Sequence, residues 1–220
     1  MHKTELKYVL VLSLIFVLPF LSAASSDKKA GKVVEIRGGK LERMGKGIWT
    51  QIFKGSGVLI GDRIRTDSNG LAVLELEGAG RFVVGPASEI ELGKNETEFK
   101  TDLSRGALWL NAKLPKGKSG VITTSIATAG IRGTKFSVFY GRGTKDLCIC
   151  TCEGMVEGTL SNGKTIQVPK GTILAVKGDA PLPEKPESAF WILEKKPSGY
   201  DFCFRCHIEG GKKKSESYWD

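Results

Sequence analysis

The stretch GVLIGDRIRTDSNGLAVLELEG, residues 57–78, determines the fold that we expect for this chain. It holds two short runs of aliphatic and β-branched residues, and Asn69-Gly70 separates them. Asn-Gly suits the left-handed dihedrals that a tight hairpin requires. In the second run, Ala72, Leu74 and Leu76 point to one side of a strand and the intervening residues to the other. The stretch therefore predicts two half-buried strands joined by a hairpin.

The same pattern of short runs and turn residues continues along residues 31–176. A second Asn-Gly pair, Asn162-Gly163, separates MVEGTLS from KTIQV and predicts another hairpin. Phe136, Val138 and Tyr140 share one face of a further strand, and no segment shows a sustained helical period. Residues 31–176 therefore predict one all-β domain, either a single antiparallel or stacked-strand sandwich or a short β-solenoid.

Several glycines and polar residues in this region have a local structural interpretation. Gly130 and Gly133 allow a sharp bend or a close approach to a neighbouring strand. Arg132 lies between these two glycines, and we expect it to pair with a carboxylate. Thr134 follows them, and we expect it to satisfy hydrogen-bonding groups of a turn. We expect this block to close the fold rather than to form a ligand site. Asp62 is expected to cap the turn that follows Gly61.

Three stretches of the β region resemble the FecR domain family. They are Gly61-Asp62 with Ile64 and Thr66; Thr123-Thr124-Ser125 with Ala127 and Ile131-Arg132-Gly133-Thr134; and Glu153-Gly154 with Val156. The resemblance covers roughly residues 31–176. It implies an extracytoplasmic all-β domain that binds a partner and relays a signal. The best-known members carry a cytoplasmic sigma-factor-binding region and a membrane span before the domain, so we expect this chain not to be such a transmembrane regulator.

The N-terminus has the pattern of a secretory signal peptide, which we assign to residues 1–24. Lys3 and Lys7 precede an apolar run over residues 8–21, and small residues follow that run. The run is shorter than the ~20 apolar residues that a membrane span needs. We therefore expect an exported chain, periplasmic or otherwise outside the cytoplasm, with the mature protein starting near Ser25.

The charge of the chain limits its partners. The formal net charge of +9 includes Lys3, Lys7 and Glu5, whose removal with the signal peptide leaves +8. This excess favours contact with anionic surfaces, whereas the exported location makes nucleic acid an unsuitable partner. We expect no enzyme, because His207 is the only histidine beyond the signal peptide and no Ser-His-Asp or Cys-His constellation can form without a further one.

Three cysteines alternate in the sequence LCICTC, residues 147–152. On a strand, Cys148, Cys150 and Cys152 share one face while Leu147 and Ile149 take the other, which suits the core. Successive Cα atoms on that face lie roughly 6.5 to 7 Å apart, and parallel side chains at this spacing are poorly placed for a disulfide between neighbours. Any disulfide or metal site would therefore need ligands from another segment.

The other two cysteines belong to Cys203-x-x-Cys206-His207, a spacing at which haem c is attached through two thioethers. In this interpretation His207 is the proximal haem ligand, and Met44, Met155, a cysteine, a lysine or water is the sixth ligand. Haem attachment requires export, which the N-terminus predicts. Only 13 residues follow His207, so the haem would use the β domain as its cover.

Two other interpretations of the cysteines remain open. In the first, Cys203, Cys206 and His207 join Cys148, Cys150 or Cys152 in a closed Cys₃His zinc site that pins the tail to the domain. In the second, the tail cysteines form disulfides with the strand cysteines and one thiol is left over, or no cofactor binds at all.

The C-terminal region, residues 177–220, reads as a linker and a tail. Pro181, Pro183 and Pro186 predict an extended linker, and residues 187–196 predict a short helix whose contiguous apolar residues dock on the domain. The sequence as a whole predicts an exported, non-catalytic binding or sensing domain with a haem- or metal-binding appendage and an envelope protein as its partner. The alternatives are a c-type haem electron carrier and a zinc- or disulfide-stapled interaction protein.

Overall fold

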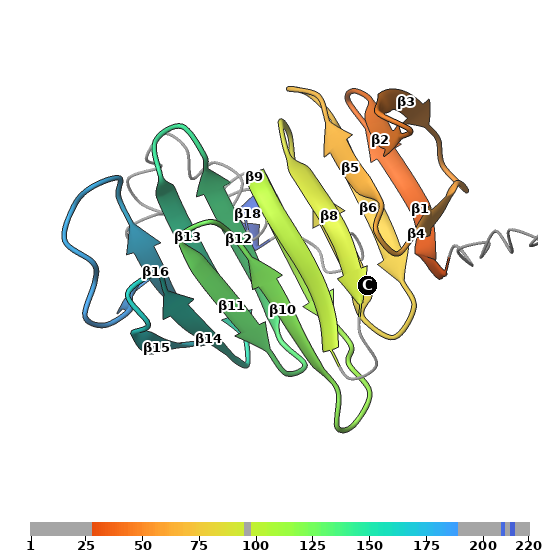
Figure 1. Cartoon of the computed structure of the whole chain (residues 1–220). Coiled ribbons are helices and arrows are strands. Elements are labelled where there is room, and N and C mark those ends of the chain that lie inside the picture. Colours follow the sequence, from red (N-terminus) through yellow and green to blue (C-terminus); the bar gives the residue numbers. More distant parts are fainter. Residues whose placement is uncertain (1–27, 95–97, 189–207, 210–211, 214–220) are drawn as a thin grey trace, which may run out of the picture.

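The structure is a computed structural model, and it describes residues 28–94, 98–188, 208–209 and 212–213. These residues form strands and turns, and no helix occurs among them, which confirms the all-β prediction. Within the same residues there is consequently no helix that could cross a membrane. Figure 1 shows the strands running side by side in two layers, with β9 near the middle.

The strands of the domain form one continuous sheet of 17 strands that folds over on itself into two halves. In the first half, called sheet A, the order is β4 (Gly57–Leu59), β1 (Lys29–Arg37), β6 (Leu71–Leu76), β7 (Gly80–Val84), the second part of β9 (Glu98–Ala112), β12 (Lys135–Gly141), β13 (Asp146–Glu153), β16 (Thr172–Val176) and β17 (Glu187–Ser188).

In the second half, called sheet B, the order is β3 (Ile48–Ile52), β2 (Leu41–Gly45), β5 (Arg63–Thr66), β8 (Glu89–Lys94), the first part of β9, β10 (Ser119–Thr123), β11 (Ala127–Ile131), β14 (Met155–Leu160) and β15 (Thr165–Pro169).

The long strand β9 joins the two halves. Its first part pairs with β8 and β10, and its second part with β7 and β12. The strand changes sheets at Gly106, whose φ of 91° is accessible to glycine and strained for other residues. The pairing of β9 with β10 is parallel, and all other pairs within the two halves are antiparallel. The architecture is therefore an open sheet with two stacked halves.

The two halves enclose one apolar core. It contains inward-facing residues of both sheets, among them Leu74 and Phe82 from sheet A and Ile64 and Leu103 from sheet B. Phe82 and Phe99 meet edge to face across the interior, with ring centroids 5.2 Å apart. Leu74 belongs to this core as the alternation of residues 71–76 predicts, and so do Phe136, Val138 and Tyr140 of β12.

The two Asn-Gly pairs have different structures. Asn162-Gly163 joins the antiparallel neighbours β14 and β15, and Gly163 has a φ of 80°, which confirms the predicted hairpin. The hairpin predicted at Asn69-Gly70 is wrong, because β5 lies in sheet B and β6 in sheet A, and the two do not pair. Asp67 instead holds a corner there, since its carboxylate accepts hydrogen bonds from the N–H groups of Lys40 and Asn69.

The C-terminal region begins as an irregular linker over residues 177–186, as the prolines predict. Glu187 and Ser188 then form β17, which pairs with β16, so the helix predicted to start at Glu187 is wrong at these two residues. A strand forms here because the backbone of β16 offers an unpaired edge of sheet A. The rest of the predicted helix lies outside the described residues. Ile208–Glu209 (β18) and Lys212–Lys213 (β19) pair in a small hairpin.

Candidate functional site

The cysteines of β13 lie on the face of sheet A that points away from the core. Leu147 and Ile149 belong to the main core, whereas Cys148 and Cys150 pack in a separate cluster with Ile173. Cys152 packs with a third cluster that includes Trp109. The predicted alternation of β13 is therefore confirmed.

Cys150 is one position in a row that crosses sheet A from β6 to β16. We call this set, which is apolar except for Ser137, the apolar row: Val73, Val83, Trp109, Ser137, Cys150 and Ile173, each directly opposite the next on the neighbouring strand. Residues opposite one another in a sheet share a face. Although the row lies on the outer face, none of its members is more than 5% exposed. A solvent-facing sheet normally shows polar residues at such positions, so this face is built for contact.

The three strand cysteines do not form a metal site by themselves. Within the described ranges, no group of three or more His, Cys, Asp and Glu residues is placed to hold a metal ion. No disulfide joins one of these three cysteines to another. Cys203, Cys206 and His207 lie outside the described residues. Haem attachment, a zinc site and disulfides with the tail would each need these three residues, so each stays a prediction.

Met155, predicted as an axial haem ligand, lies on sheet B rather than on the cysteine-bearing sheet. It is the first residue of β14 and is 47% exposed, whereas the following Val156 points into the core. The structure therefore does not bring Met155 together with Cys148 and Cys150.

The block Ile131-Arg132-Gly133-Thr134 forms the corner between β11 of sheet B and β12 of sheet A, so it closes the fold as predicted. Gly133 has a φ of 63°, and Thr134 is buried and its carbonyl accepts a hydrogen bond from the N–H of Ala112. Arg132 is exposed, and among the described residues it forms no ion pair, contrary to the expectation that it pairs with a carboxylate.

Asp62 caps a turn as predicted, but this turn spans residues 59–62 and contains Gly61 rather than following it. The Asp62 carboxylate accepts a hydrogen bond from the N–H of Leu59 at 2.8 Å and lies 3.5 Å from a guanidinium nitrogen of Arg43. Gly61, just before it, has a φ of 86°. This part of the family pattern therefore serves the fold.

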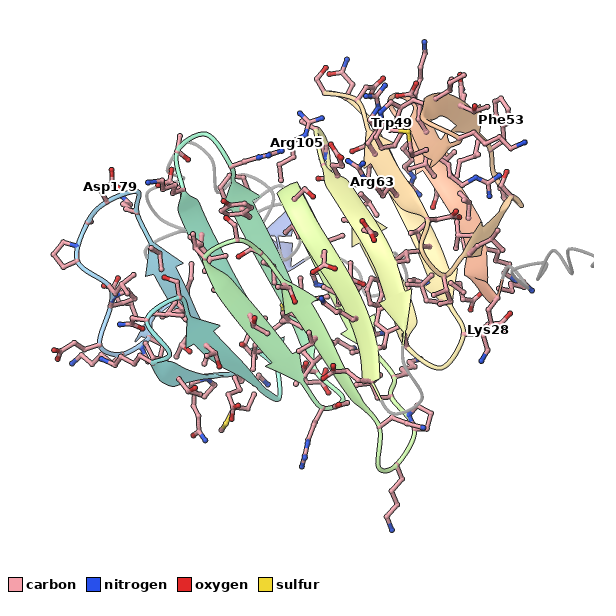
Figure 2. All side chains as sticks on the ribbon, in the orientation of Figure 1. Lys28, Trp49, Phe53, Arg63, Arg105 and Asp179 are labelled. Atoms are coloured by element: carbon pink, nitrogen blue, oxygen red, sulfur yellow. The ribbon has the colours of Figure 1, made fainter. Side chains whose placement is uncertain are left out.

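A polar groove of about 510 Å³ lies where β9 passes from sheet B to sheet A. Its lining residues come from both sheets: Arg63, Glu91, Asp102, Leu103, Ser104, Thr123, Thr124, Ser125, Tyr140 and Arg142. Arg63, Glu91, Asp102 and Thr123 are neighbours across successive strands of sheet B. We call the hollow that all the lining residues enclose the polar groove. Figure 2 labels Arg63, which lines the groove.

Hydroxyl groups shape one wall of the polar groove. Thr124 caps the β10–β11 turn, because its Oγ1 accepts a hydrogen bond from the N–H of Ala127 and its own N–H donates to the carbonyl of that residue. The hydroxyls of Ser125 and Tyr140 share a short hydrogen bond. This bond ties a turn of sheet B to a strand of sheet A.

A set of ion pairs lies beside the groove and includes one of its lining residues, Arg63. Glu89 bridges Arg63 at 2.5 Å and Arg105 at 3.5 Å. On the adjoining strands, Glu42 pairs with Arg65 at 2.7 Å, and the Trp49 ring lies 4.2 Å from the guanidinium carbon of Arg65. Such ion pairs add little stability at a surface, but they orient the guanidinium groups. The outer face of sheet B is therefore polar and charged, unlike that of sheet A.

Sequence reasoning identified Thr123, Thr124 and Ser125 only as part of a resemblance and missed the polar groove. The outward positions of Glu91 and Asp102 follow from strand alternation. Their meeting with Tyr140 and Arg142 depends on how the two halves stack, and no short-range pattern carries that information.

The folded-over sheet, with a polar groove at one end and a buried apolar row on one outer face, defines an all-β domain with two candidate contact surfaces. Residues 62–157 match the family model described as FecR protein. This part of the chain is therefore similar to the FecR family, as the three sequence stretches indicated. A comparison with curated proteins finds no significant match.

Solved structures support the fold. Two crystal structures, at 2.50 and 1.65 Å resolution, of a "putative anti-sigma factor" from Parabacteroides distasonis ATCC 8503 each align with a TM-score of 0.53 and 14% sequence identity. The first alignment covers 62% of this chain and 64% of that protein, and the second covers 62% and 65%. At this identity the likeness shows the shared fold.

Proposed function

We propose that this chain is an exported, non-catalytic FecR domain that binds an envelope protein through the polar groove and takes part in signalling. The observation that carries the proposal is that the Thr123-Thr124-Ser125 stretch of the FecR domain forms one wall of that groove. The description of the structurally similar proteins as anti-sigma factors supports a signalling role.

The groove suits a polar peptide segment of a protein partner. Arg63 and Arg142 offer guanidinium groups to a carboxylate, and Glu91 and Asp102 offer carboxylates to a lysine or arginine. The hydroxyls of Ser104 and Thr123 supply further donors and acceptors. This mixture of opposite charges selects a partner by complementarity rather than by apolar area.

Site-specific photo-crosslinking tests the groove. A photoreactive amino acid replaces Ser104 in the full-length chain. The chain is produced with its signal peptide in bacterial cells that also contain its envelope partner. We expect one adduct of discrete mass with an envelope protein, and we expect Asp102→Lys to reduce that adduct at least roughly tenfold, because a reversed charge faces the same partner.

The control places the photoreactive group at Ile48, which is 68% exposed on β3, away from the groove. An adduct equally strong from both positions, or one unaffected by Asp102→Lys, would contradict binding through the groove.

We further propose that Cys203, Cys206 and His207 hold a covalently attached haem that serves sensing. The support is the spacing of these residues together with the predicted export. Both sulfurs would form thioethers, and the imidazole would be the proximal ligand. If the haem is the main purpose of the chain, the protein is an electron carrier with the FecR domain as its scaffold.

Intact mass and colour test the haem proposal. The full-length gene is expressed in a strain that exports proteins and attaches haem to them. We expect a red protein whose mass corresponds to the chain from about Ser25 plus one haem. Cys203→Ser and His207→Ala should lower the haem content, whereas Cys148→Ser on β13 should leave it unchanged.

A colourless protein of the apo mass would overturn the haem proposal and leave groove binding untouched. Metal analysis then separates the remaining possibilities. Zinc that is present in the wild-type protein and lost in Cys148→Ser indicates the shared zinc site, and its absence from both indicates disulfides.

A further inference from the structure

We propose that the apolar row is the docking surface for the chain's own C-terminal segment, residues 189–193, whose sequence is AFWIL. This inference does not depend on the groove or on a haem. It concerns a face of sheet A that the FecR match does not explain, and it commits to one occupant.

The first support is the burial of the row. Val83, Ser137 and Ile173 are fully buried, and Trp109 is 3% exposed, although all point away from the core. The strands of sheet B stack on the opposite, core-facing side of sheet A, so they do not bury this row. An apolar face that spans six strands loses contact with water only if another segment covers it.

The second support is the place where the described chain ends. β17 pairs with β16 so that Glu187 stands directly opposite Ile173, which is the last member of the apolar row. The described chain therefore reaches Ser188 at the edge of sheet A, next to the level of this row. The linker before β17 is held in place, because Leu182 packs against the core and Asp146 accepts a hydrogen bond from the N–H of Gly178.

The third support is that length and composition match. Trp109 lies four strand spacings from β17, which is ~19 Å at the usual 4.8 Å per strand. Five extended residues at ~3.3 Å each cover ~16 Å, so residues 189–193 are long enough to extend from β17 past β12 toward Trp109. Residues 189–193 are all apolar and include Phe190 and Trp191. Burying two aromatic side chains against an apolar face is a strong drive for docking.

The residues on either side of the apolar row limit which segment can dock there. On one side runs a polar row, in which Glu75, Arg81, Asn111, Lys135 and Glu153 face one another across the strands. On the other side Phe139 and Ala175 extend the apolar surface beside Cys148. A five-residue apolar segment fits this strip, whereas the charged tail sequence KKKSES does not.

Thiol labelling tests the docking on the full-length chain, purified in reduced form and without haem. Cys150 should react slowly with a maleimide in the wild-type protein. Trp191→Asp combined with Ile192→Asp should speed its labelling at least roughly tenfold, because a docked aromatic segment with two carboxylates leaves the face. The site of labelling is read by peptide mass mapping.

The matched control is Ile48→Asp, which places the same charge on an exposed position of β3 and should leave the labelling rate unchanged. Equal labelling rates in the wild-type and double variant would overturn the proposal. A labelling rate that falls with protein concentration, together with a dimer in sedimentation, would assign the face to a second copy instead and also overturn it.

A crosslinking measurement avoids any question of folding in the double variant. A photoreactive residue at position 191 of the otherwise unchanged chain should form intramolecular adducts with peptides from β9, β12 or β13. Adducts confined to sheet B, adducts between two chains, or no adduct at all would each count against docking of residues 189–193 on the apolar row.

Discussion

Gly106→Ala should prevent the domain from folding stably, with a loss of about 4 kcal/mol or more in the free energy of unfolding. Gly106 adopts a φ of 91°, and an added Cβ would lie 2.2 Å from Oγ of Ser88 and 2.4 Å from its Cα. Since a backbone atom blocks the methyl group, a side-chain rotation cannot relieve the clash. Ser88 cannot retreat, because its hydroxyl accepts a hydrogen bond from the N–H of Ala107 at 2.8 Å.

Urea denaturation of the purified variants measures this loss, and Gly45→Ala is the matched control. Gly45 ends β2, and a Cβ there would meet no atom within 4 Å. The control should stay within about 0.5 kcal/mol of the wild-type protein. A Gly106→Ala protein as stable as the control would mean that β9 does not pass between the two sheets at this residue.

The division of the chain into strands was predictable because alternation and turn residues act over short distances. Asn69-Gly70 shows where this information ends. The same dipeptide makes a hairpin at Asn162-Gly163 and a corner between sheets here, because β5 and β6 find different partners far along the chain. An added Cβ at Gly70 would lie 2.7 Å from the Lys40 carbonyl oxygen, so this glycine serves close packing rather than a hairpin dihedral.

The cysteine face was predictable from the alternation of β13, but its burial was not. Cys148 and Cys150 read as outward-facing because Leu147 and Ile149 suit the core. Burial of this outer face, which also includes Val83 and Trp109 of distant strands, depends on what covers sheet A, and no short-range pattern carries that information. The polar groove could not be predicted from the sequence either. Tyr140 contacts Ser125 only when sheet A stacks on sheet B.

Thr66→Val should cost roughly 2 to 6 kcal/mol of stability, whereas Thr101→Val should cost nothing or stabilise the domain slightly. Both threonines are buried, and the substitution is nearly isosteric at both. The Thr66 hydroxyl donates to the Gly85 carbonyl at 2.6 Å and accepts from the Ser88 N–H at 3.0 Å. Valine there would strand two buried backbone groups at the corner between β7 and β8, each worth about 1 to 3 kcal/mol.

The Thr101 hydroxyl is buried without a hydrogen-bond partner among the described residues. Valine at this position removes a desolvated hydroxyl and keeps the packing, so the free energy of unfolding should change by less than about 1 kcal/mol. Urea denaturation provides the measurement. The midpoints of the two variants are compared where the unfolding free energy has the same dependence on urea concentration. Equal losses at both positions would show that volume, rather than hydrogen bonding, makes Thr66 necessary. A large loss confined to Thr66 would establish that this threonine ties β5 to the β7–β8 corner through the backbone N–H of Ser88, whose hydroxyl accepts the hydrogen bond from Ala107 of β9.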